Sequence, residues 1–172
     1  QIINFPPLQN DEIISYLSLS GVDSSLAEFA AGMSEGNMNY AQRICKNGIE
    51  GIKQLIEKFT STLIVYNEKS WRIFIQDYTR MAQNNFTEYE FHLFLFQCWL
   101  NQARKKRNDL YGKPLFEQIN ENIENFNSKF PDARLDQINL MVEEIINAPK
   151  KNFFMPIQLT NFLIGVQKRL YN

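Results

Sequence analysis

The stretch 27–44, AEFAAGMSEGNMNYAQRI, places two short helices on either side of a turn that contains Gly36. Its small residues recur on the faces that would meet if these helices packed together: Ala27, Ala30, Ala31 and Ala41. Small side chains let helix backbones approach closely, and glycine suits a helix end that needs a positive φ. We therefore expect a compact unit of short helices, onto which the rest of the chain is built.

Composition favours a helical, globular chain. The 172 residues are 44% hydrophobic and 22% charged, as in folded proteins. Seven Gly and six Pro are few, and Thr and Val are sparse, so strands are disfavoured. The longest apolar run, 91–100, is far shorter than the roughly 20 residues that a membrane span needs, so we expect no membrane contact.

Charge and cysteine content argue against several classes of function. The formal net charge of −1 gives no overall basic field of the kind that nucleic-acid-binding proteins usually carry. Two cysteines, Cys45 and Cys98, make neither a disulfide framework nor a tetrahedral zinc site. A reducing cytoplasm is therefore the expected compartment.

The chain begins with a short β-prone segment, 1–5, which Pro6 and Pro7 stop. It has no basic region and no cleavage-like site, so it does not fit a signal peptide. We interpret it as the last strand of an upstream domain, which makes the sequence a piece of a longer protein.

Three short helices are predicted next, each with a polar residue at its start. The capping residues and ranges are Asn10 for 11–19, Asp23 for 24–34, and Asn37 for a helix that runs to about Lys46. Asn47, Gly48 and Gly51 then mark the clearest boundary in the chain.

After this boundary, apolar residues recur every three or four positions over longer stretches, as in amphipathic helices. The stretches are 52–66, 71–81, 116–130, 135–145 and 159–170. Thr87 and Glu90 form a capping box for one more helix, whose part 91–100 is apolar on nearly all sides and should be central. Pro114 and Pro156 suit first turns, while Pro131 and Pro149 separate helices. We predict an all-α chain, with three short helices followed by an antiparallel bundle of about six longer ones.

The turn Ser34-Glu35-Gly36-Asn37, with Ala41 four residues further on, forms the motif (S/A)-E-G-(N/D)-x-x-x-A between two helices. This motif resembles the lid subdomain of AAA+ clamp-loader subunits. The opening QIINFPPL is similar to the end of their ATPase domain. The long helical remainder, with Asn147-Ala148-Pro149-Lys150 near its end, resembles the delta-prime subunits of bacterial DNA polymerase III.

The resemblance implies three parts. Residues 1–8 would end a missing ATPase domain, residues 9–47 would form a three-helix lid, and residues 48–172 would form a collar domain. In clamp loaders the collar joins subunits into the ring that places the sliding clamp on primed DNA. The implied partners are therefore the motor and delta subunits, with DNA only indirectly involved and no small-molecule substrate.

Asn39 departs from the ATP-hydrolysing members of this family, which carry an arginine three residues after the motif glycine. A neutral amide cannot stabilise developing phosphate charge as an arginine does. Arg43 lies one turn later, outside the motif position, and the sequence has no Walker-type glycine loop. The resemblance thus implies a subunit that does not hydrolyse ATP. We expect no catalytic, cofactor-binding or metal-binding residues in this chain.

His92 is the only histidine, and Glu88 lies one helical turn before it, a spacing that two metal ligands can use. A di-iron bundle needs several Glu and a second His, so a histidine at the edge of the bundle is the better interpretation. Cys45 and Cys98 lie among apolar residues and are interpreted as small buried side chains. An enzyme is therefore the weakest hypothesis.

Two groups of residues are candidates for contacts with a partner. The basic run Arg104, Lys105, Lys106 and Arg107 is either a solvated helix end or a surface for an acidic partner or DNA backbone. The second group is mostly aromatic and consists of Phe153, Phe154, Met155 and Tyr171. These residues are either part of the core or exposed for contact with neighbouring subunits.

The first hypothesis is a non-catalytic scaffold part of a clamp-loader subunit, with a hinge near Gly48 and Gly51 that passes movements of the ATPase domain to the collar. The alternative is an unrelated all-helical protein-interaction or adaptor domain.

Overall fold

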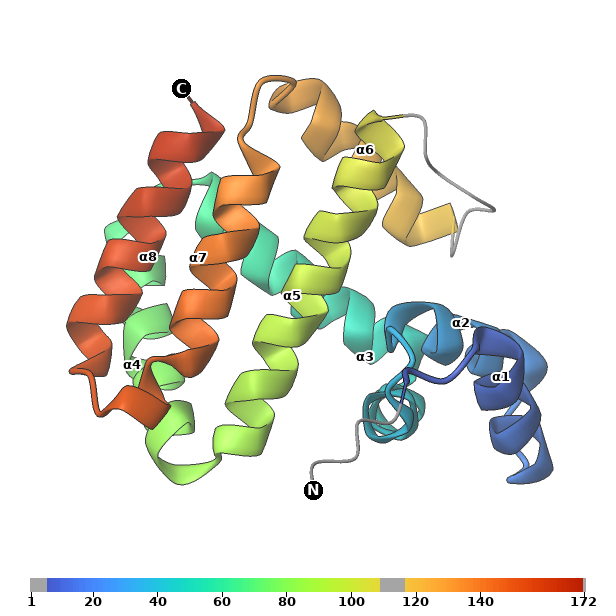
Figure 1. The fold of residues 1–172 in the computed structure, drawn as a ribbon. Coiled ribbons are helices and arrows are strands. Elements are labelled where there is room, and N and C mark those ends of the chain that lie inside the picture. Colours follow the sequence, from blue (N-terminus) through green and yellow to red (C-terminus); the bar gives the residue numbers. More distant parts are fainter. Residues whose placement is uncertain (1–5, 109–116, 172) are drawn as a thin grey trace.

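The computed structural model describes residues 6–108 and 117–171, and all regular structure in these ranges is helical, which confirms the predicted all-α class. The elements are α1 (Asn10–Leu19), α2 (Ser24–Met33), α3 (Met38–Ile64), α4 (Glu68–Asn84), α5 (Phe86–Arg107), α6 (Glu117–Lys129), α7 (Leu135–Asn147), the 3₁₀-helix η1 (Pro149–Lys151) and α8 (Met155–Leu170). Figure 1 shows α1 and α2 beside the start of α3, set apart from the bundle. The predicted strand over 1–5 lies outside the described residues.

The small residues of α2 and α3 are buried, as expected where these two helices pack against each other. Ala27, Ala30, Ala31 and Ala41 are all completely buried. Helix α1 packs mainly against α2 and places Ile13 in the same core. Helices α1 and α2 and the start of α3 up to residue 47 therefore form one compact unit, called here the N-terminal unit.

Two of the predicted helix caps are present. The Asp23 carboxylate accepts a hydrogen bond from the backbone N of Ser25 at 2.9 Å, and the Asn37 side chain accepts one from the backbone N of Asn39 at 3.0 Å. Each bond satisfies a backbone N–H in the first turn that has no partner within its helix.

Two other predicted helix starts are wrong by one or two residues. Helix α1 begins at Asn10 rather than after it, because Glu12 reaches back to the backbone N of Gln9 at 2.8 Å and makes Gln9 the cap. Helix α5 begins at Phe86, with Asn85 as the cap, so Thr87 lies inside the first turn and the predicted capping box is absent there.

The predicted boundary after Asn47 is a kink within one element. The backbone leaves helical geometry at Gly48, with φ 69° and ψ 166°, and the helix resumes at the next residue. The predicted third short helix, which runs to about Lys46, is therefore present as the first of two segments of α3, 38–47 and 49–64.

Helix α5 is the central helix of the bundle, as predicted from its apolar sequence. It packs against α3, α4, α6 and α7, and its buried side chains occur on all sides of the helix. They include Tyr89, Phe91, Leu93, Leu95, Phe96, Cys98, Trp99 and Leu100. The Tyr89 hydroxyl donates to the backbone O of Ile145 at 2.5 Å and ties α5 to α7.

The apolar stripes predicted for α6, α7 and α8 face the core. The buried members are Ile119, Ile123, Phe126, Phe130, Leu135, Ile138, Val142, Ile145, Leu159, Phe162, Leu163, Val166 and Leu170. Pro114 and Phe116, which were predicted to begin α6, lie outside the described residues. Across 6–108 and 117–171, no helix combines the length and apolarity that crossing a bilayer requires.

The two glycines near the kink should respond in opposite ways to alanine. Gly48 has a backbone conformation that is essentially restricted to glycine, so Gly48→Ala should lower the free energy of unfolding by about 1–3 kcal/mol. Gly51 is helical, and an added Cβ would lie at an ordinary 3.5 Å from the Asn47 Cβ. Gly51→Ala should therefore raise the free energy of unfolding by about 0.5–1 kcal/mol. Urea denaturation followed by circular dichroism measures both; equal effects would contradict the kink.

Candidate functional site

The turn that joins α2 to α3 uses two residues with positive φ, Glu35 at 48° and Gly36 at 82°. Ser34 is completely buried, and its hydroxyl donates to the backbone O of Ala31 at 3.1 Å. The positive φ of Gly36 confirms the turn position expected from the sequence. The motif residues therefore shape this turn through backbone conformation and a local hydrogen bond.

Gly36 also lies against the segment that enters α1. The backbone N of Leu8 donates to the backbone O of Gly36 at 3.1 Å. A Cβ added at Gly36 would lie 2.5 Å from the Cβ of Pro7 and 2.9 Å from the backbone O of Leu8, closer than real Cβ atoms approach other atoms. Glycine is thus required at this position both by its φ and by the adjacent chain.

Asn39 and Arg43 occupy different surroundings on α3. Asn39 is exposed in the first turn. One turn later, Arg43 donates from Nη1 to the backbone O of Thr87 at 2.9 Å and pairs through Nη2 with Glu88. Its guanidinium also lies 4.2 Å from the ring centroid of Phe91. Arg43 is therefore committed to α5 and is not available near Asn39.

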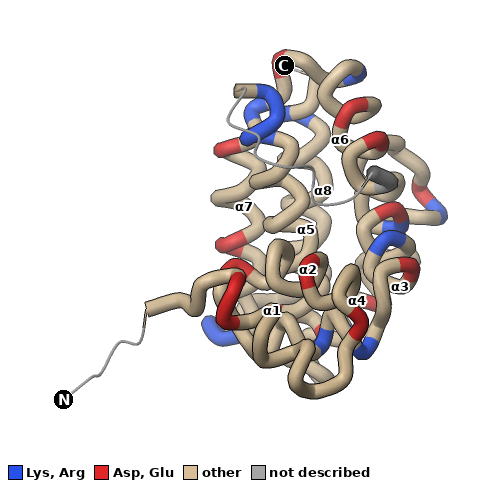
Figure 2. Tube along the Cα trace, turned by 90° about the vertical axis from the view of Figure 1, so that its right-hand side faces the viewer, with Lys and Arg blue, Asp and Glu red and all other residues tan. Residues whose placement is uncertain are grey.

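Apart from Arg43, the only Lys, Arg or His in the N-terminal unit, up to the kink at Gly48, is Lys46, seven residues after Asn39. Residues 1–42 contain five acidic residues and no Lys, Arg or His. Figure 2 shows the acidic positions on α1 and α2. Phosphate recognition needs positively charged or N–H-rich groups, so this unit is electrostatically unsuited to it.

Several further contacts attach the N-terminal unit to the middle of α5. The rings of Tyr40 and Phe94 stack with 4.1 Å between their centroids. The Cys98 thiol donates a hydrogen bond to the backbone O of Met33 at 3.3 Å, and the Asn101 side chain donates one to the Glu35 carboxylate at 3.1 Å. Together with Arg43, these contacts extend along more than three turns of α5.

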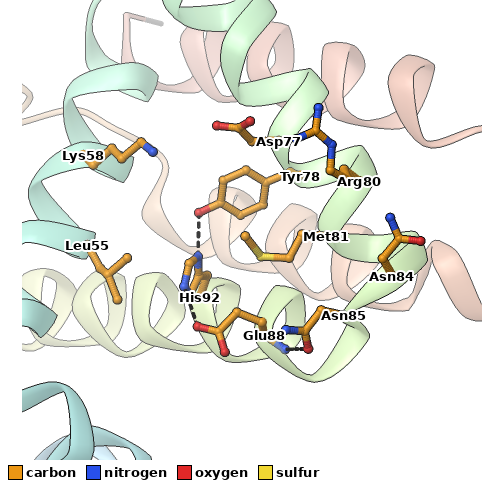
Figure 3. A pocket seen from close by; sticks show the side chains of 10 residues that line it. All are labelled: Leu55, Lys58, Asp77, Tyr78, Arg80, Met81, Asn84, Asn85, Glu88 and His92. Carbon is orange, nitrogen blue, oxygen red and sulfur yellow. Dashed lines mark hydrogen bonds and ion pairs between the residues drawn. The ribbon is translucent and has the colours of Figure 1, made fainter.

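A cavity of about 360 Å³ opens between the second segment of α3, α4 and α5. Figure 3 shows the residues that line it: Leu55, Lys58, Asp77, Tyr78, Arg80, Met81, Asn84, Asn85, Glu88 and His92. The apolar part of the wall comes from Leu55, Met81 and the ring of Tyr78. The polar groups carry both signs of charge, so the cavity has no strong preference for one charge of ligand.

His92 lies at the wall of this cavity and links α4 to α5. Its Nδ1 is 3.2 Å from the Tyr78 hydroxyl, and its Nε2 is 3.0 Å from a Glu88 carboxylate oxygen. Burial lowers the pKa of His92, and the Glu88 carboxylate opposes that change. Because both ring nitrogens have partners, His92 acts here as a structural link at the edge of the bundle, as interpreted from the sequence.

The structure does not bring further metal ligands to His92. Within 6–108 and 117–171, no group of three or more His, Cys, Asp or Glu side chains is arranged to hold a metal ion. Burial raises the pKa of both the Cys45 and the Cys98 thiols, the latter well above its ordinary value. Neither cysteine therefore has the thiolate character that a nucleophile needs.

The aromatic group near α8 divides into exposed and buried members. Phe153, Phe154 and Tyr171 are 49%, 68% and 61% exposed, so they are accessible to a partner. Met155 is 4% exposed, because it begins α8 and packs into the core. Met155 is therefore wrong as a surface candidate.

The basic run at the end of α5 is more than a solvated helix end. Arg104 Nη1 donates to Asp136 Oδ1 at 2.7 Å, and Arg107 donates to the backbone O atoms of Phe130 and Ala133, each at 2.8 Å. These contacts hold the end of α5 against α7 and against the connection between α6 and α7.

Comparisons with protein-family models, with curated proteins and with solved structures found no match. Function must therefore be inferred from the geometry of the chain itself.

Sequence reasoning missed the chain of contacts from Arg43 through Glu88 and His92 to Tyr78. Glu88 and His92 share a helix face, and that spacing was the one available signal. Arg43 and Glu88 are 45 positions apart, and Tyr78 and His92 are 14 apart on different helices. No local sequence pattern predicts contacts between residues that are this far apart in the chain.

Gly36→Ala should be more destabilising than Gly21→Ala, although both glycines have a φ of 82°. At Gly21 an added Cβ meets nothing within 4 Å, so only the backbone strain of about 1–2 kcal/mol is expected. At Gly36 the collision with the incoming chain should add at least about 1 kcal/mol. Urea denaturation of both variants measures the difference. Equal losses would show that Pro7 and Leu8 do not lie against the turn.

Glu88→Gln should lower the pKa of His92 further, because the carboxylate that opposes the effect of burial is removed. NMR titration of the single histidine measures this pKa directly. Glu90→Gln is the matched control, since Glu90 pairs with Lys150 and not with His92. A raised pKa in the Glu88 variant would contradict the assigned contact.

The same lowered pKa sets the direction of a pH effect on stability. Unfolded chains bind a proton at His92 more readily than the folded chain does. The free energy of unfolding should therefore fall as pH drops through the ordinary pKa of histidine, and stop falling below the pKa of the folded state. This decline should be larger in Glu88→Gln.

Proposed function

We propose that this chain is the lid and collar part of a clamp-loader subunit of the delta-prime type, and that it acts as a non-catalytic scaffold in DNA replication. The observation that carries the proposal is the turn at Gly36. The motif glycine has positive φ and receives a backbone hydrogen bond from Leu8. A domain upstream of Pro7 would therefore be joined to the lid at a fixed point.

The position of the kink supports the proposed division into two parts. The segment 38–47 follows directly from the turn after α2, while in 49–64 Phe59 stacks on Phe96 of α5 and the backbone O of Leu63 accepts a hydrogen bond from Gln167 of α8. Gly48 lies between them, where the proposed lid ends and the proposed collar begins. Its backbone conformation gives the two parts of α3 different directions.

The contacts of the N-terminal unit favour rigid coupling over a free hinge. Arg43, Tyr40 and Asn101 all bridge the proposed lid and α5. A tilt of the upstream domain would move α5 and the bundle with it, since these contacts span Gly48. The collar would thereby respond to the ATPase domain without binding nucleotide.

The proposed lack of ATP hydrolysis has its own support. Asn39 provides no positive charge at the motif position, and Arg43 is held by Thr87, Glu88 and Phe91. The proposed partners are the motor and delta subunits in the cytoplasm, and the scaffold role itself involves DNA only indirectly, through the assembled ring.

An unrelated helical adaptor domain is the second candidate. Phe153 and Phe154 are exposed side by side before α8, and such aromatic residues serve as anchors in many protein interfaces. This feature fits any helical scaffold with a protein partner, whereas the turn at Gly36 and the division at Gly48 favour the clamp-loader proposal.

Gel filtration of the full-length protein with motor and delta subunits of the same source tests the proposal. We expect co-elution in one complex at low salt. Failure of the unmodified protein to join the complex would overturn the clamp-loader proposal and leave the adaptor as the better candidate.

A pair of variants tests which surface is used in that complex. Phe154→Asp should weaken co-elution, while Leu140→Asp on α7 should not. The two side chains are similarly exposed, 68% and 59%, so neither change should unfold the bundle. Equal co-elution of the two variants would show that Phe154 does not lie in the interface, and it would leave the clamp-loader proposal itself unaffected.

A further inference from the structure

One end of the bundle carries a surface rich in arginine and lysine, called here the basic end. Its cations come from four helix termini: Arg104, Lys105, Lys106 and Arg107 in the last turn of α5, Lys129 at the end of α6, Arg134 directly before α7, and Lys168 and Arg169 in the last turn of α8. In Figure 1 these termini meet at the end of the molecule that holds the C-terminus, far from α1 and α2.

Contacts between the termini make the basic end one continuous surface. Arg104 Nη1 lies 2.7 Å from Asp136 Oδ1 and connects α5 to α7. The backbone N of Arg134 donates to the backbone O of Arg169 at 3.0 Å and connects the start of α7 to the end of α8. Lys106 pairs with Glu124 and connects α5 to α6. These contacts therefore join the four termini at one end of the bundle.

The charge of the basic end is hidden in the composition of the whole chain. In residues 119–136 and the last turns of α5 and α8, the acidic residues are Glu121, Glu124, Asp132 and Asp136, against the eight cations named above. The overall net charge is nevertheless −1, partly because residues 1–42 contribute five acidic residues and no cation. Opposite ends of the molecule thus differ in the sign of their charge.

A hollow of about 300 Å³ lies within the basic end. Arg104, Arg107 and Arg134 line it, together with the amide side chains of Asn108 and Gln137. The guanidinium of Arg107 is held in place by three acceptors, and that of Arg104 by Asp136, which also lines the hollow. Arginine and amide N–H groups fixed around a hollow suit the oxygens of a phosphate group.

We propose that the basic end binds the sugar–phosphate backbone of a nucleic acid. A protein interface would need an apolar centre, but the apolar residues of the hollow, Ala133 and Leu135, are each only 5% exposed. Nucleic-acid interfaces are instead polar and strongly positive. The exposed Tyr171 ring at the end of α8, whose hydroxyl donates to the backbone O of Ile64 at 3.2 Å, supplies a surface on which a base can stack.

This binding goes beyond the proposed scaffold function and requires no other subunit, so the chain can be tested alone. Fluorescence anisotropy of a labelled oligothymidylate of about 20 nucleotides measures it, with salt varied from about 50 to about 200 mM. We expect binding that weakens steeply with salt. Absence of binding at the lowest salt would overturn the proposal, whether or not the protein joins a clamp loader.

Charge reversal at two exposed positions locates the site. Arg134→Glu with Lys168→Glu should weaken binding at least about tenfold and make the dependence on salt shallower by roughly 0.7 per lost phosphate contact. The matched control is Lys46→Glu with Lys151→Glu, which reverses two exposed lysines on α3 and η1 outside the basic end. Circular dichroism checks that both proteins are folded. An equal loss of oligothymidylate binding in the control protein would overturn the assignment of the binding site to the basic end.

Two further measurements separate a nucleic acid from an acidic protein as the partner. Tyr171→Ala should weaken binding while leaving the salt dependence unchanged, because stacking involves no phosphate charge. Polyglutamate with the same number of charges should displace the oligothymidylate poorly. Displacement as effective as that by unlabelled oligothymidylate would overturn the nucleic-acid proposal in favour of an acidic protein.

Discussion

The burial of α5 is the constraint on which the rest of the structure depends. Its apolar side chains lie on all sides, so one neighbouring helix cannot cover them, and α3, α4, α6 and α7 all pack against it. Trp99 and Phe91 at its centre are almost completely buried. The four cations of its last turn cannot enter this core, so the helix has to end at the surface, where Arg104 and Arg107 bind the adjacent elements.

Local patterns predicted the helices well because the prolines and glycines of this chain agree with its apolar periodicity. The predicted helix limits that differ from the structure do so because two neighbouring residues could each cap the helix, or because one glycine could either end or bend it. Glu12 stabilises a cap at Gln9, and Asn85 competes with Thr87 as the start of α5. Gly48 indicates the end of a helix, and the structure shows a kink there, because a single residue with positive φ can redirect a helix without a loop.

The functional surfaces were less predictable, because they depend on pairs that are distant in sequence. The motif predicted the positive φ of Gly36 but not the contact with Pro7 and Leu8. The basic run predicted one helix terminus, whereas Arg134 and Arg169 join it only through the packing of α7 and α8. Net charge concealed this surface, since the acidic N-terminal unit cancels it in the sum over the chain.

The surroundings of Arg43 connect the proposed loss of ATP hydrolysis with the stiffness of the molecule. An arginine that contacts nucleotide phosphates has to direct its N–H groups at them, whereas Arg43 directs its N–H groups to a backbone oxygen and a carboxylate of α5 and lies over an aromatic ring of the same helix. Each of these contacts favours one orientation of the N-terminal unit on the bundle. In the proposed lid, the neutral Asn39 would not sense phosphate, and the guanidinium of Arg43 would hold the lid on the bundle. Both features fit the proposed scaffold. A subunit that does not respond to its own nucleotide is most useful when it transmits the movement of its neighbours without bending.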